Sequence, residues 1–254
     1  MQRIPDAIQL TDLDDDALAD LYAYPAEQEQ SWLRVNFVAS IDGAVTGAGG
    51  VSGALGTPAD KRVFHLLRDL CEVVLVGAGT VRAENYGGAH TDPRLRRELF
   101  ARGIGGHAEG APPPIAIVTA SAALDPGHRV LGTAATPTLI LTTAAAPAER
   151  VRALTAAGAE VIVIGDEVIE PRAVPAALAA RGLRRVLCEG GPQLFGSLAA
   201  EGAIDELCLT TAPLLVGGTA RRIAVSHQEF ALRMNPAHLL IDTDATMLTR
   251  WVRA

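Results

Sequence analysis

Short apolar runs rich in valine, isoleucine and leucine alternate with amphipathic segments along most of this chain. Apolar runs of this kind are typical of strands buried on both faces of a parallel sheet, and the amphipathic segments suit helices that cross between such strands. No linker or repeat interrupts the alternation. The sequence therefore predicts a single α/β domain over residues 31–254, with a mainly parallel central sheet and flanking helices.

The positions of these runs give the individual elements. We expect strands in residues 32–40, 73–80, 114–119, 138–143, 159–165, 184–191 and 204–218, and helices in residues 57–71, 147–158, 171–182 and 192–202. Two further strands in residues 238–254, separated by the polar stretch from Asp242 to Asp244, predict an antiparallel C-terminal strand.

Local signals mark several boundaries. Thr57 and Pro58 precede an amphipathic segment, and these two residue types favour the cap and the first turn of a helix. Residues 87–113 are rich in glycine, proline and charge, so they are expected to form a long loop with one short helix. Residues 1–30 are expected to be an acidic N-terminal extension in which Thr11 caps a short helix.

Composition excludes several classes of partner. The formal net charge of −7 argues against nucleic-acid binding, which requires clustered basic residues. No apolar run approaches membrane-spanning length and no signal peptide is evident, so a cytoplasmic protein without a membrane partner is expected. Histidine and cysteine lack the spacing of metal ligands, which predicts no metal site. Cys71, Cys188 and Cys208 lie in or beside apolar runs and are expected to be buried and reduced.

Two strand-to-helix turns carry glycine. In the first, "VGAGT", Gly77 and Gly79 leave the backbone exposed, and Thr80 is placed to cap the following turn. The stretch is not a dinucleotide fingerprint, because Arg82 stands where that motif requires glycine. A tight connection without a ligand would suit the same glycines. Ligands of open parallel sheets bind at such turns, so a nucleotide site remains the alternative.

The second turn, "CEGGPQLFGSL", joins an acid to a potential anion site. Gly190 and Gly191 permit the close approach of a pyrophosphate, and Pro192 suits the first position of a helix whose N-terminus favours anions. Glu189 would repel a phosphate at the same place. Because side chains alternate along a strand, we expect Glu189 to face a second ligand while the backbone from Gly191 onward serves the phosphate.

Three ordered segments resemble one family. "VNFVASIDGAV", "HLLRDLCEVVLVGAGTV" and "VLCEGGPQLFGSLAAEGAIDELCLTTAPLLVGG" are similar to the riboflavin-pathway pyrimidine reductases, over a range from about Trp32 to the end of the chain. The resemblance implies a dihydrofolate-reductase-like fold, NADPH as cofactor, no metal and a homodimer. It also implies reduction of the ribosylamino side chain of a pyrimidine phosphate to a ribitylamino one.

The resemblance assigns cofactor roles by position. Ala39 would flank the nicotinamide, and Thr119 and Ser121 would lie near the adenosine 2′-phosphate. The stretch from Gly191 to Ser197 would wrap the pyrophosphate. The residues expected along the cofactor are Ala39, Gly77, Gly79, Thr80, Glu84, Thr119, Ser121, Gly190, Gly191, Pro192, Gln193, Leu194 and Phe195.

The same comparison assigns residues to the substrate. Ser52 and Arg68 would hold it, and the planar fork of Arg68 suits a phosphate. Read without the family, Arg68 is better interpreted as a helix residue whose apolar stem packs on the surface while its charge stays in water. Asp42 would face the reacting centre and Glu189 would lie on the substrate's side. Either acid could relay a proton or stabilise an iminium form, and the sequence does not choose between them.

The chain departs from the family after the first glycine turn. Family members continue with a segment of the type D-N-P-x-L-T-x-R that helps to hold the substrate's phosphate, whereas this chain has "AENYGGAHTDPRLR". Glu84 replaces the acid, but Tyr86 and the two following glycines break the pattern and displace the arginine. Arg94 or Arg96 is the expected substitute.

This departure leaves two rival functions open. The chain shows no zinc deaminase signature, so it is expected to be a stand-alone reductase domain. A dihydrofolate or pterin reductase would use the same scaffold, with a carboxylate binding the pteridine nitrogens. A non-catalytic NADP-binding module is the other alternative, and the acids Asp42 and Glu189 argue against it, because a pure binder would not require them.

Overall fold

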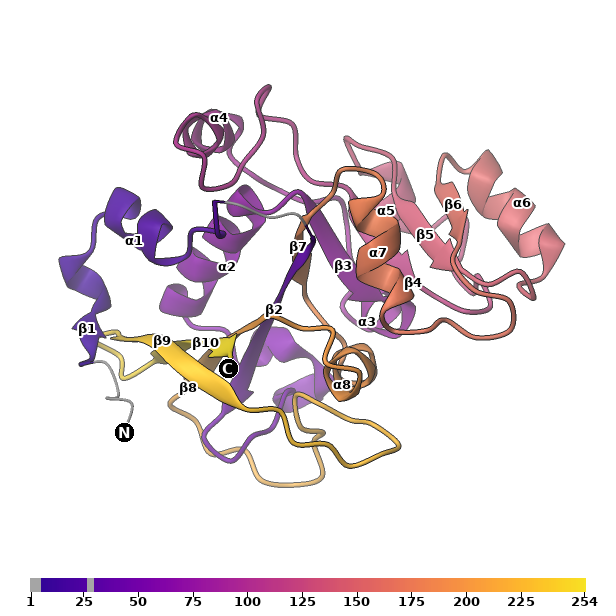
Figure 1. Ribbon diagram of the computed structural model, residues 1–254. Coiled ribbons are helices and arrows are strands. Elements are labelled where there is room, and N and C mark those ends of the chain that lie inside the picture. The colour runs from indigo at the N-terminus through magenta and orange to yellow at the C-terminus, as the bar shows by residue number, and fades with distance from the viewer. Residues whose placement is uncertain (1–5, 27–29) are drawn as a thin grey trace.

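The computed structural model describes residues 6–26 and 30–254 (Figure 1). Its strands are β1 (Ile8–Gln9), β2 (Trp32–Ser40), β3 (Val73–Gly77), β4 (Ile115–Val118), β5 (Leu139–Thr142), β6 (Glu160–Val163), β7 (Arg185–Cys188), β8 (Glu206–Ala212), β9 (Met234–Ile241) and β10 (Met247–Arg253). Its α-helices are α1 (Asp15–Leu21), α2 (Pro58–Leu70), α3 (Ala78–Ala83), α4 (Pro93–Ala101), α5 (Arg129–Gly132), α6 (Ala148–Ala156), α7 (Ala173–Ala179) and α8 (Pro192–Ala200). These elements confirm the predicted alternation of strands and helices.

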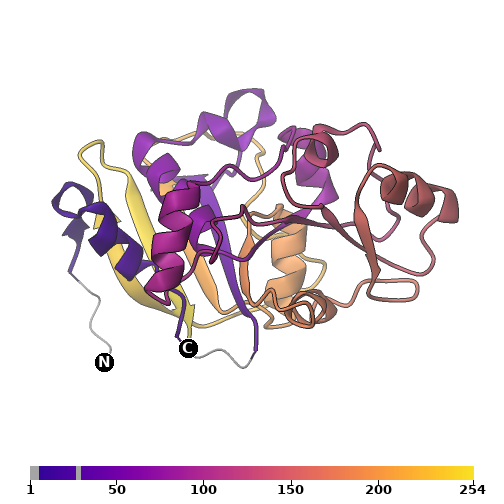
Figure 2. The same cartoon turned by 90° about the horizontal axis from the view of Figure 1, so that it is seen from above.

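One sheet holds all the strands of the described residues, in the order β1-β9-β10-β8-β2-β7-β3-β4-β5-β6. The strands from β8 through β2 and β7 to β6 are parallel neighbours, whereas β10 runs antiparallel to both β8 and β9. The first and last segments of the chain lie at one end of the sheet, and β5, β6 and α6 lie at the other end (Figure 1, Figure 2). The mainly parallel sheet with an antiparallel C-terminal strand is therefore confirmed.

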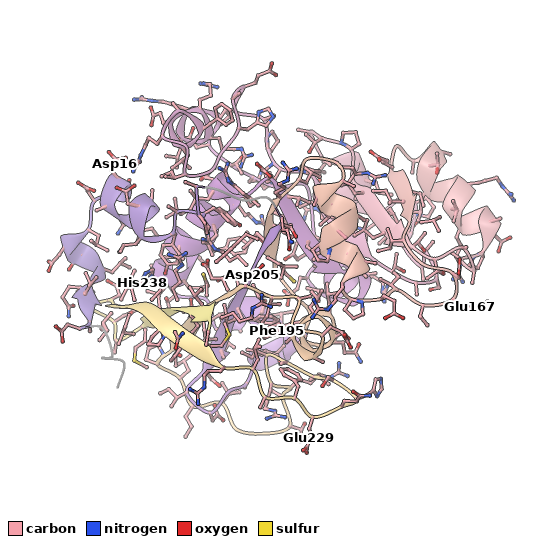
Figure 3. The ribbon with its side chains drawn as sticks, viewed as in Figure 1. Asp16, Glu167, Phe195, Asp205, Glu229 and His238 are labelled. Carbon is pink, nitrogen blue, oxygen red and sulfur yellow. The ribbon has the colours of Figure 1, made fainter. Side chains whose placement is uncertain are left out.

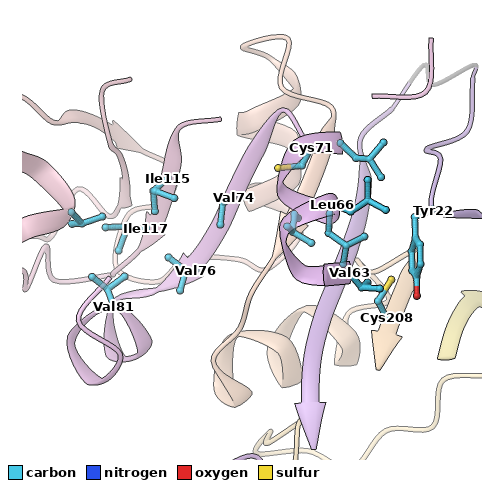
Figure 4. Packing of buried hydrophobic residues seen from close by; sticks show 14 of the residues in the cluster. Tyr22, Val63, Leu66, Cys71, Val74, Val76, Val81, Ile115, Ile117 and Cys208 are labelled. Atoms are coloured by element: carbon cyan, nitrogen blue, oxygen red, sulfur yellow. The ribbon is translucent and has the colours of Figure 1, made fainter. Parts of the chain in front are cut away.

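Helices cover both faces of the sheet. Successive side chains of its inner strands point to opposite sides, and the apolar side chains on each side pack against helices. Val74 and Val76 of β3 pack into one core with residues of α1, α2, α4 and α6, and part of this core is drawn in Figure 4. Val73 and Leu75 of the same strand pack into a second core with α7 and α8. The glycine turns at the end of β3 therefore lie between two helical layers.

Two predicted caps are wrong. Asp14 rather than Thr11 caps α1, since its carboxylate accepts the N–H of Ala17, and Thr11 belongs to a preceding 3-10 turn. Thr80 lies inside α3, which begins at Ala78 without a side-chain cap. In contrast, the hydroxyl of Thr57 caps α2 as predicted.

Proline limits β8. The apolar run continues to residue 218, but the strand ends at Ala212, so the predicted long strand is wrong in its second half. Pro213 follows, and a proline has no N–H to donate to a neighbouring strand. The stretch from Leu214 to Val216 is consequently an exposed loop. Within residues 6–26 and 30–254, no helix is long and apolar enough to cross a membrane.

A buried charge network ties the N-terminal segment to the sheet. Arg34 and Arg250 both bond the carboxylate of Glu206, with Nε–Oε1 distances of 2.6 and 2.9 Å. The same guanidinium groups donate to the carbonyls of Tyr22 and Leu21 at 2.8 and 2.7 Å. The segment after α1 is thus fastened to the sheet through its backbone carbonyls.

Candidate active site

A cleft of about 1110 Å³ opens where β2, β3 and β7 end. Parallel strands present their carboxyl ends at one edge, and ligands of open α/β sheets bind there. Most of the lining comes from β2, the loop that follows it, one face of α2, the turn into α3, the segment 84–90, and the start of α8. The sheet therefore assembles in one place the two glycine turns that are far apart in the sequence.

The two turns touch each other. The N–H of Gly77 donates to the carbonyl of Gly190 at 2.8 Å, because β3 and β7 are neighbours. A side chain at Gly191 would collide with Oγ1 of Thr80, and one at Gly190 would approach the ring of Phe37 to 2.7 Å. Glycine is needed here for close packing between the turns as well as for access to a ligand.

The start of α8 offers free donors to the cleft. Gly191 precedes the helix and no side chain caps it, so the N–H groups of Gln193 and Leu194 have no partner within the helix. Both residues line the cleft together with Pro192. An uncapped helix N-terminus beside two glycines fits a pyrophosphate, and this arrangement suits the dinucleotide that the sequence predicts.

Arg68 and Tyr86 hold Glu189 at the floor of the cleft. Nε and Nη2 of Arg68 donate to the two carboxylate oxygens, each at 2.7 Å, and the hydroxyl of Tyr86 donates to Oε2 at 2.6 Å. The Arg68 side chain also stacks over the ring of Phe64. Although burial lowers the pKa of Arg68, the Glu189 carboxylate raises it above its usual range. The two residues therefore form a charged, preorganised pair.

This pairing brings together residues that the sequence assigned to the substrate. Glu189 was expected to face a ligand with its carboxylate, and in the structure both of its oxygens already have donors. Tyr86, which breaks the family pattern, is one of those donors. Burial and the neighbouring carboxylate raise the pKa of Tyr86 well above its usual value, so its hydroxyl stays protonated at neutral pH.

Ser52 and Glu84 lie together in the lining of the cleft. The carboxylate of Glu84 accepts the backbone N–H of Ser52 at 2.9 Å, and both residues line the cleft. This bond fixes the loop after β2 against the segment after α3. Glu84 thus shapes the cleft by holding the loop after β2 in place.

Asp42 lies outside the lining of the cleft. Its carboxylate accepts the Ser40 hydroxyl and the N–H groups of Val216 and Gly217, the last at 2.7 Å. These hydrogen bonds, that of Ser40 first, lower the pKa of Asp42 to about 2. The acid therefore fastens the loop after β8 to the turn after β2.

Other predicted cofactor residues also lie outside the lining. Ala39 is buried in β2 opposite Thr211, and Phe195 is buried against Phe37 with ring centroids 5.4 Å apart. Figure 3 shows Phe195 in the interior, in contrast to Glu167 and Glu229 at the surface. The predicted residues that line the cleft are Ser52, Arg68, Gly77, Gly79, Thr80, Glu84, Glu189, Gly191, Pro192, Gln193 and Leu194.

Thr119 and Ser121, the residues predicted to lie near the adenosine 2′-phosphate, do not line the cleft. Thr119 follows Val118, which does line the cleft, and its hydroxyl accepts the N–H of Ala123 at 3.2 Å. The carbonyl of Ser121 accepts from Arg150 at 3.3 Å. These contacts organise the loop after β4 at the edge of the cleft.

Neither predicted substitute for the displaced arginine reaches the cleft, so that prediction is wrong. Arg96 is buried, and its guanidinium donates to the carbonyls of Arg68, Asp69, Cys71 and Ala111. Arg94 is exposed and pairs with Glu98 one turn along α4. Both side chains stabilise the loop 87–113 instead.

Sequence reasoning missed several lining residues. Asp60 and Lys61 reach the cleft from the first turn of α2, and burial raises the pKa of Asp60. Arg129 reaches it from α5, and Arg221 from the loop after β8. For Asp60 and Lys61 a signal existed. They lie on the same helix as Arg68, so a cleft that reaches Arg68 can also reach the first turn of α2. Nothing local marked Arg129 or Arg221.

The cysteines are unreactive by environment. Cys71, Cys188 and Cys208 are free and buried, as predicted. Burial raises the pKa of Cys188, which directly precedes Glu189, to about 12. A thiol with such a pKa is not a nucleophile at neutral pH.

A parallel sheet with glycine turns, a free helix N-terminus and a charged pair at its carboxyl edge defines an α/β protein with a preformed ligand cleft. The RibD C-terminal domain model matches residues 31–247 of the chain. Because that match spans most of the sequence, the chain belongs to the RibD C-terminal domain family. The resemblance noted in the sequence is thereby confirmed.

Relatives with assigned activities point the same way. The 2,5-diamino-6-ribosylamino-4(3H)-pyrimidinone 5′-phosphate reductase of Methanothermobacter thermautotrophicus is 34% identical over 195 residues, covering 76% of this chain and 83% of the relative. The reductase of the same name from Aquifex aeolicus is 29% identical over 232 residues, covering 88% and 96%. These relatives and the family identify the chain as a reductase.

A solved structure shares the fold. The crystal structure of a pyrimidine reductase-like protein from Corynebacterium diphtheriae has a TM-score of 0.75 at 24% identity, and the match covers 88% of this chain and 92% of the other. At this identity the likeness concerns the fold alone.

Proposed function

We propose that the chain is an NADPH-dependent reductase that acts on the ribosylamino-pyrimidine phosphate of riboflavin biosynthesis. The observation that carries this proposal is the junction of the two glycine turns with the Arg68–Glu189 pair at one edge of the sheet. One side of the junction offers backbone donors suited to a pyrophosphate, and the other offers charged side chains suited to a polar second ligand. Relatives named for this reduction belong to the same family.

The cofactor would supply a hydride to the ribosylamino carbon, and the protein supplies position and electrostatics. Gly77, Gly191 and the N–H groups at the start of α8 would hold the pyrophosphate. Phe37 and Val38 of β2 line the cleft beside the glycines and provide an apolar wall that excludes water. Because these groups belong to strands and a helix, the reacting atoms are held on a rigid frame.

Glu189 is the acid that we assign to the substrate's side, since it lines the cleft and Asp42 does not. Fixed by Arg68 and Tyr86, its carboxylate would stabilise a cationic form of the ribosylamino group as the hydride arrives. Asp42 would act through the loop after β8. Among the described residues, Oε1 of Glu189 accepts only from Nε of Arg68 and keeps one lone pair for a donor from the substrate, whereas Oε2 already accepts from both Arg68 and Tyr86.

The contacts of Glu189 also bear on the pterin alternative. Two-point recognition of a pteridine requires both carboxylate oxygens to face the ligand with free acceptor directions. Here the guanidinium of Arg68 occupies that two-point geometry. The arrangement therefore favours a pyrimidine phosphate over a dihydrofolate-like substrate.

Purified protein with NADPH should distinguish the possibilities. The ribosylamino-pyrimidine phosphate and dihydrofolate are supplied separately, and loss of NADPH absorbance is followed. Turnover of the pyrimidine alone is the expected result, and the ribitylamino product is identified by mass spectrometry. Turnover of dihydrofolate alone, or NADPH binding without oxidation of either compound, would contradict the proposal.

The proposed assembly is a homodimer. Ile41 and Leu215 are 63% and 79% exposed, and the N–H of Ile41 bonds the carbonyl of Leu214, so these apolar side chains belong to adjoining loops. Exposed apolar side chains in neighbouring loops suit burial against another subunit. Light scattering after size-exclusion chromatography is expected to give twice the chain mass, and a monomer mass would contradict this assembly.

A further inference from the structure

An arginine from a remote part of the chain reaches the cleft without a charged partner. Arg129 lies at the start of α5 and lines the cleft. Its guanidinium makes no salt bridge and no hydrogen bond with any residue in the ranges 6–26 and 30–254. Arg68, in contrast, is neutralised by Glu189. The cleft is thus lined both by a neutralised arginine, Arg68, and by Arg129, which has no charged partner among the described residues.

Two glycines allow Arg129 to take this position. A Cβ at Gly87 would lie 3.1 Å from Nη2 and 3.2 Å from Nε of Arg129, so the absence of a side chain admits the guanidinium. A Cβ at Gly88 would lie 2.7 Å from the carbonyl oxygen of Thr133, which prevents any side chain there. Gly87 and Gly88, which interrupt the segment after α3, therefore pack directly against α5 and the residues that follow it.

Hydrogen bonds fix the backbone that carries the arginine. The N–H of Gly88 donates to Oγ1 of Thr133 at 3.0 Å, and that hydroxyl donates to the carbonyl of Arg129 at 2.8 Å. Val130, the next residue, is fully buried in the core that also contains α2. The base of the Arg129 side chain is thus anchored, while its charged end remains available to the cleft.

The surroundings of Arg129 belong to the substrate's side of the cleft. Gly87 follows Tyr86, whose ring lies 5.8 Å from the Arg68 guanidinium carbon and whose hydroxyl bonds Glu189. The helices α7 and α8 pack on the opposite face of the sheet. Arg129 therefore extends the Arg68–Tyr86 wall rather than the wall formed by the start of α8.

We propose that Arg129 binds the phosphate monoester of the substrate. This inference rests on the proposed function, whose substrate is a ribose 5′-phosphate derivative. A free guanidinium presents a planar fork of donors that matches two phosphate oxygens, and a dianion would supply the charge that the cleft lacks at this point. The phosphate-binding arginine then comes from α5, between β4 and β5, rather than from the segment after α3.

Two other free cations are less suited to this role. Lys61 lies on the first turn of α2, two helical turns before Arg68, and its ammonium is a point charge without a fork. The backbone carbonyl of Arg221 accepts the N–H of Val45. In the same loop, the N–H of Val225 donates to the carbonyl of Pro192 at the start of α8. Arg221 is thus placed toward the proposed cofactor wall.

Direct binding of ribose 5-phosphate tests the assignment independently of turnover. Calorimetric titration of the whole protein is expected to show affinity that falls about 10- to 100-fold in Arg129→Ala, as for loss of a hydrogen-bonded ion pair. Gly87→Ala should weaken binding in the same direction, because its methyl group displaces only the flexible end of the arginine. Arg94→Ala removes the same charge outside the cleft and should bind like the wild type.

Kinetics and cofactor binding complete the test. In Arg129→Ala, KM for the phosphorylated pyrimidine should rise by the same factor while the Kd of NADPH stays unchanged. Equal ribose 5-phosphate affinity in Arg129→Ala and Arg94→Ala, a loss of NADPH affinity in place of sugar-phosphate affinity, or no binding by the wild type would each overturn the proposal. Binding that depends on Arg129 without pyrimidine turnover would uphold this inference and contradict the proposed function instead.

Discussion

Arg68 donates to both carboxylate oxygens of Glu189, which is 121 residues away in the sequence. The Nε–Oε1 and Nη2–Oε2 distances are both 2.7 Å. The pair joins a helix on one face of the sheet to the end of a central strand, and it lies almost fully out of water. Removing one partner of such a buried ion pair destabilises the protein, because the remaining charge stays out of water without a counter-charge. The floor of the cleft therefore depends on both partners.

Replacement of Glu189 by glutamine should separate substrate chemistry from cofactor binding. The amide loses the negative charge and leaves Arg68 without its ion pair, so kcat/KM for the pyrimidine is expected to fall about 100-fold. The Kd of NADPH, measured by fluorescence, should change less than about twofold, since the contacts proposed for NADPH involve other atoms. Glu98→Gln, which breaks the exposed pair with Arg94, is the matched control and should be silent. Collapse of NADPH affinity would show that Glu189 belongs to the cofactor's side.

Removing the Tyr86 hydroxyl should have a smaller effect on the same step. Tyr86→Phe keeps the ring near Arg68 and deletes one of the three donors to Glu189. We expect kcat/KM to fall about 3- to 10-fold, the value of one ordinary hydrogen bond, because Arg68 still donates to both oxygens of Glu189. Because its pKa is raised well above 10, the hydroxyl stays protonated and the pH–rate profiles of variant and wild type should run parallel from pH 6 to 9.

Tyr24→Phe provides the comparison for that variant. The Tyr24 hydroxyl is also buried but has no hydrogen-bond partner among the described residues, and its ring stacks with Arg34. Its loss should leave kcat/KM unchanged. A Tyr86→Phe enzyme as active as Tyr24→Phe would contradict the role given to the Tyr86–Glu189 bond.

The contact between Gly191 and Thr80 allows a test by a double variant. A methyl group at position 191 would collide with Oγ1 of Thr80, so Gly191→Ala should raise the Kd of NADPH about tenfold or more. Adding Thr80→Ala removes the obstructing oxygen and should restore part of the affinity. Gly132→Ala, where a Cβ would meet nothing within 4 Å, serves as the control. Strict additivity of the Gly191 and Thr80 effects would contradict the collision.

The sequence predicted those parts of the fold that local patterns determine. The strand at residues 32–40 and the helix capped by Thr57 follow from apolar spacing and cap chemistry, and the structure confirms both. The overrun of β8 arose because the apolar run continues past Pro213, where the missing N–H ends the pairing. Elements were therefore predictable wherever one short segment contains all the information.

The site was predictable only in its local half. Both glycine turns were found, because each turn is a short motif at the end of a strand. The partner of Glu189 was not, since its contact with Arg68 joins segments that periodicity cannot place side by side. Arg129 left no signal at all, because it enters the cleft through the space left by Gly87. Contacts between distant segments require the packed structure.

Protonation of a buried histidine should make the fold acid-sensitive. His238 of β9 packs edge-on against Tyr22, with centroids 4.8 Å apart, and its Nε2 has no partner among the described residues. Burial, assisted by the nearby Arg250, lowers the pKa of His238 from 6.5 to about 4. The unfolded chain then binds a proton at higher pH than the folded one, so stability is full above pH 6.5 and falls as the pH drops toward 4.

Urea unfolding between pH 7 and pH 5 measures this contribution. The wild type is expected to lose about 2 kcal/mol of unfolding free energy from His238 over that interval. His238→Phe keeps an aromatic ring against Tyr22 without a titrating group, and its stability should fall by about 2 kcal/mol less over the same interval. His65→Gln alters an exposed histidine and should retain the wild-type slope. Equal slopes in wild type and His238→Phe would mean that His238 titrates alike in the folded and unfolded chains, and this result would contradict the prediction.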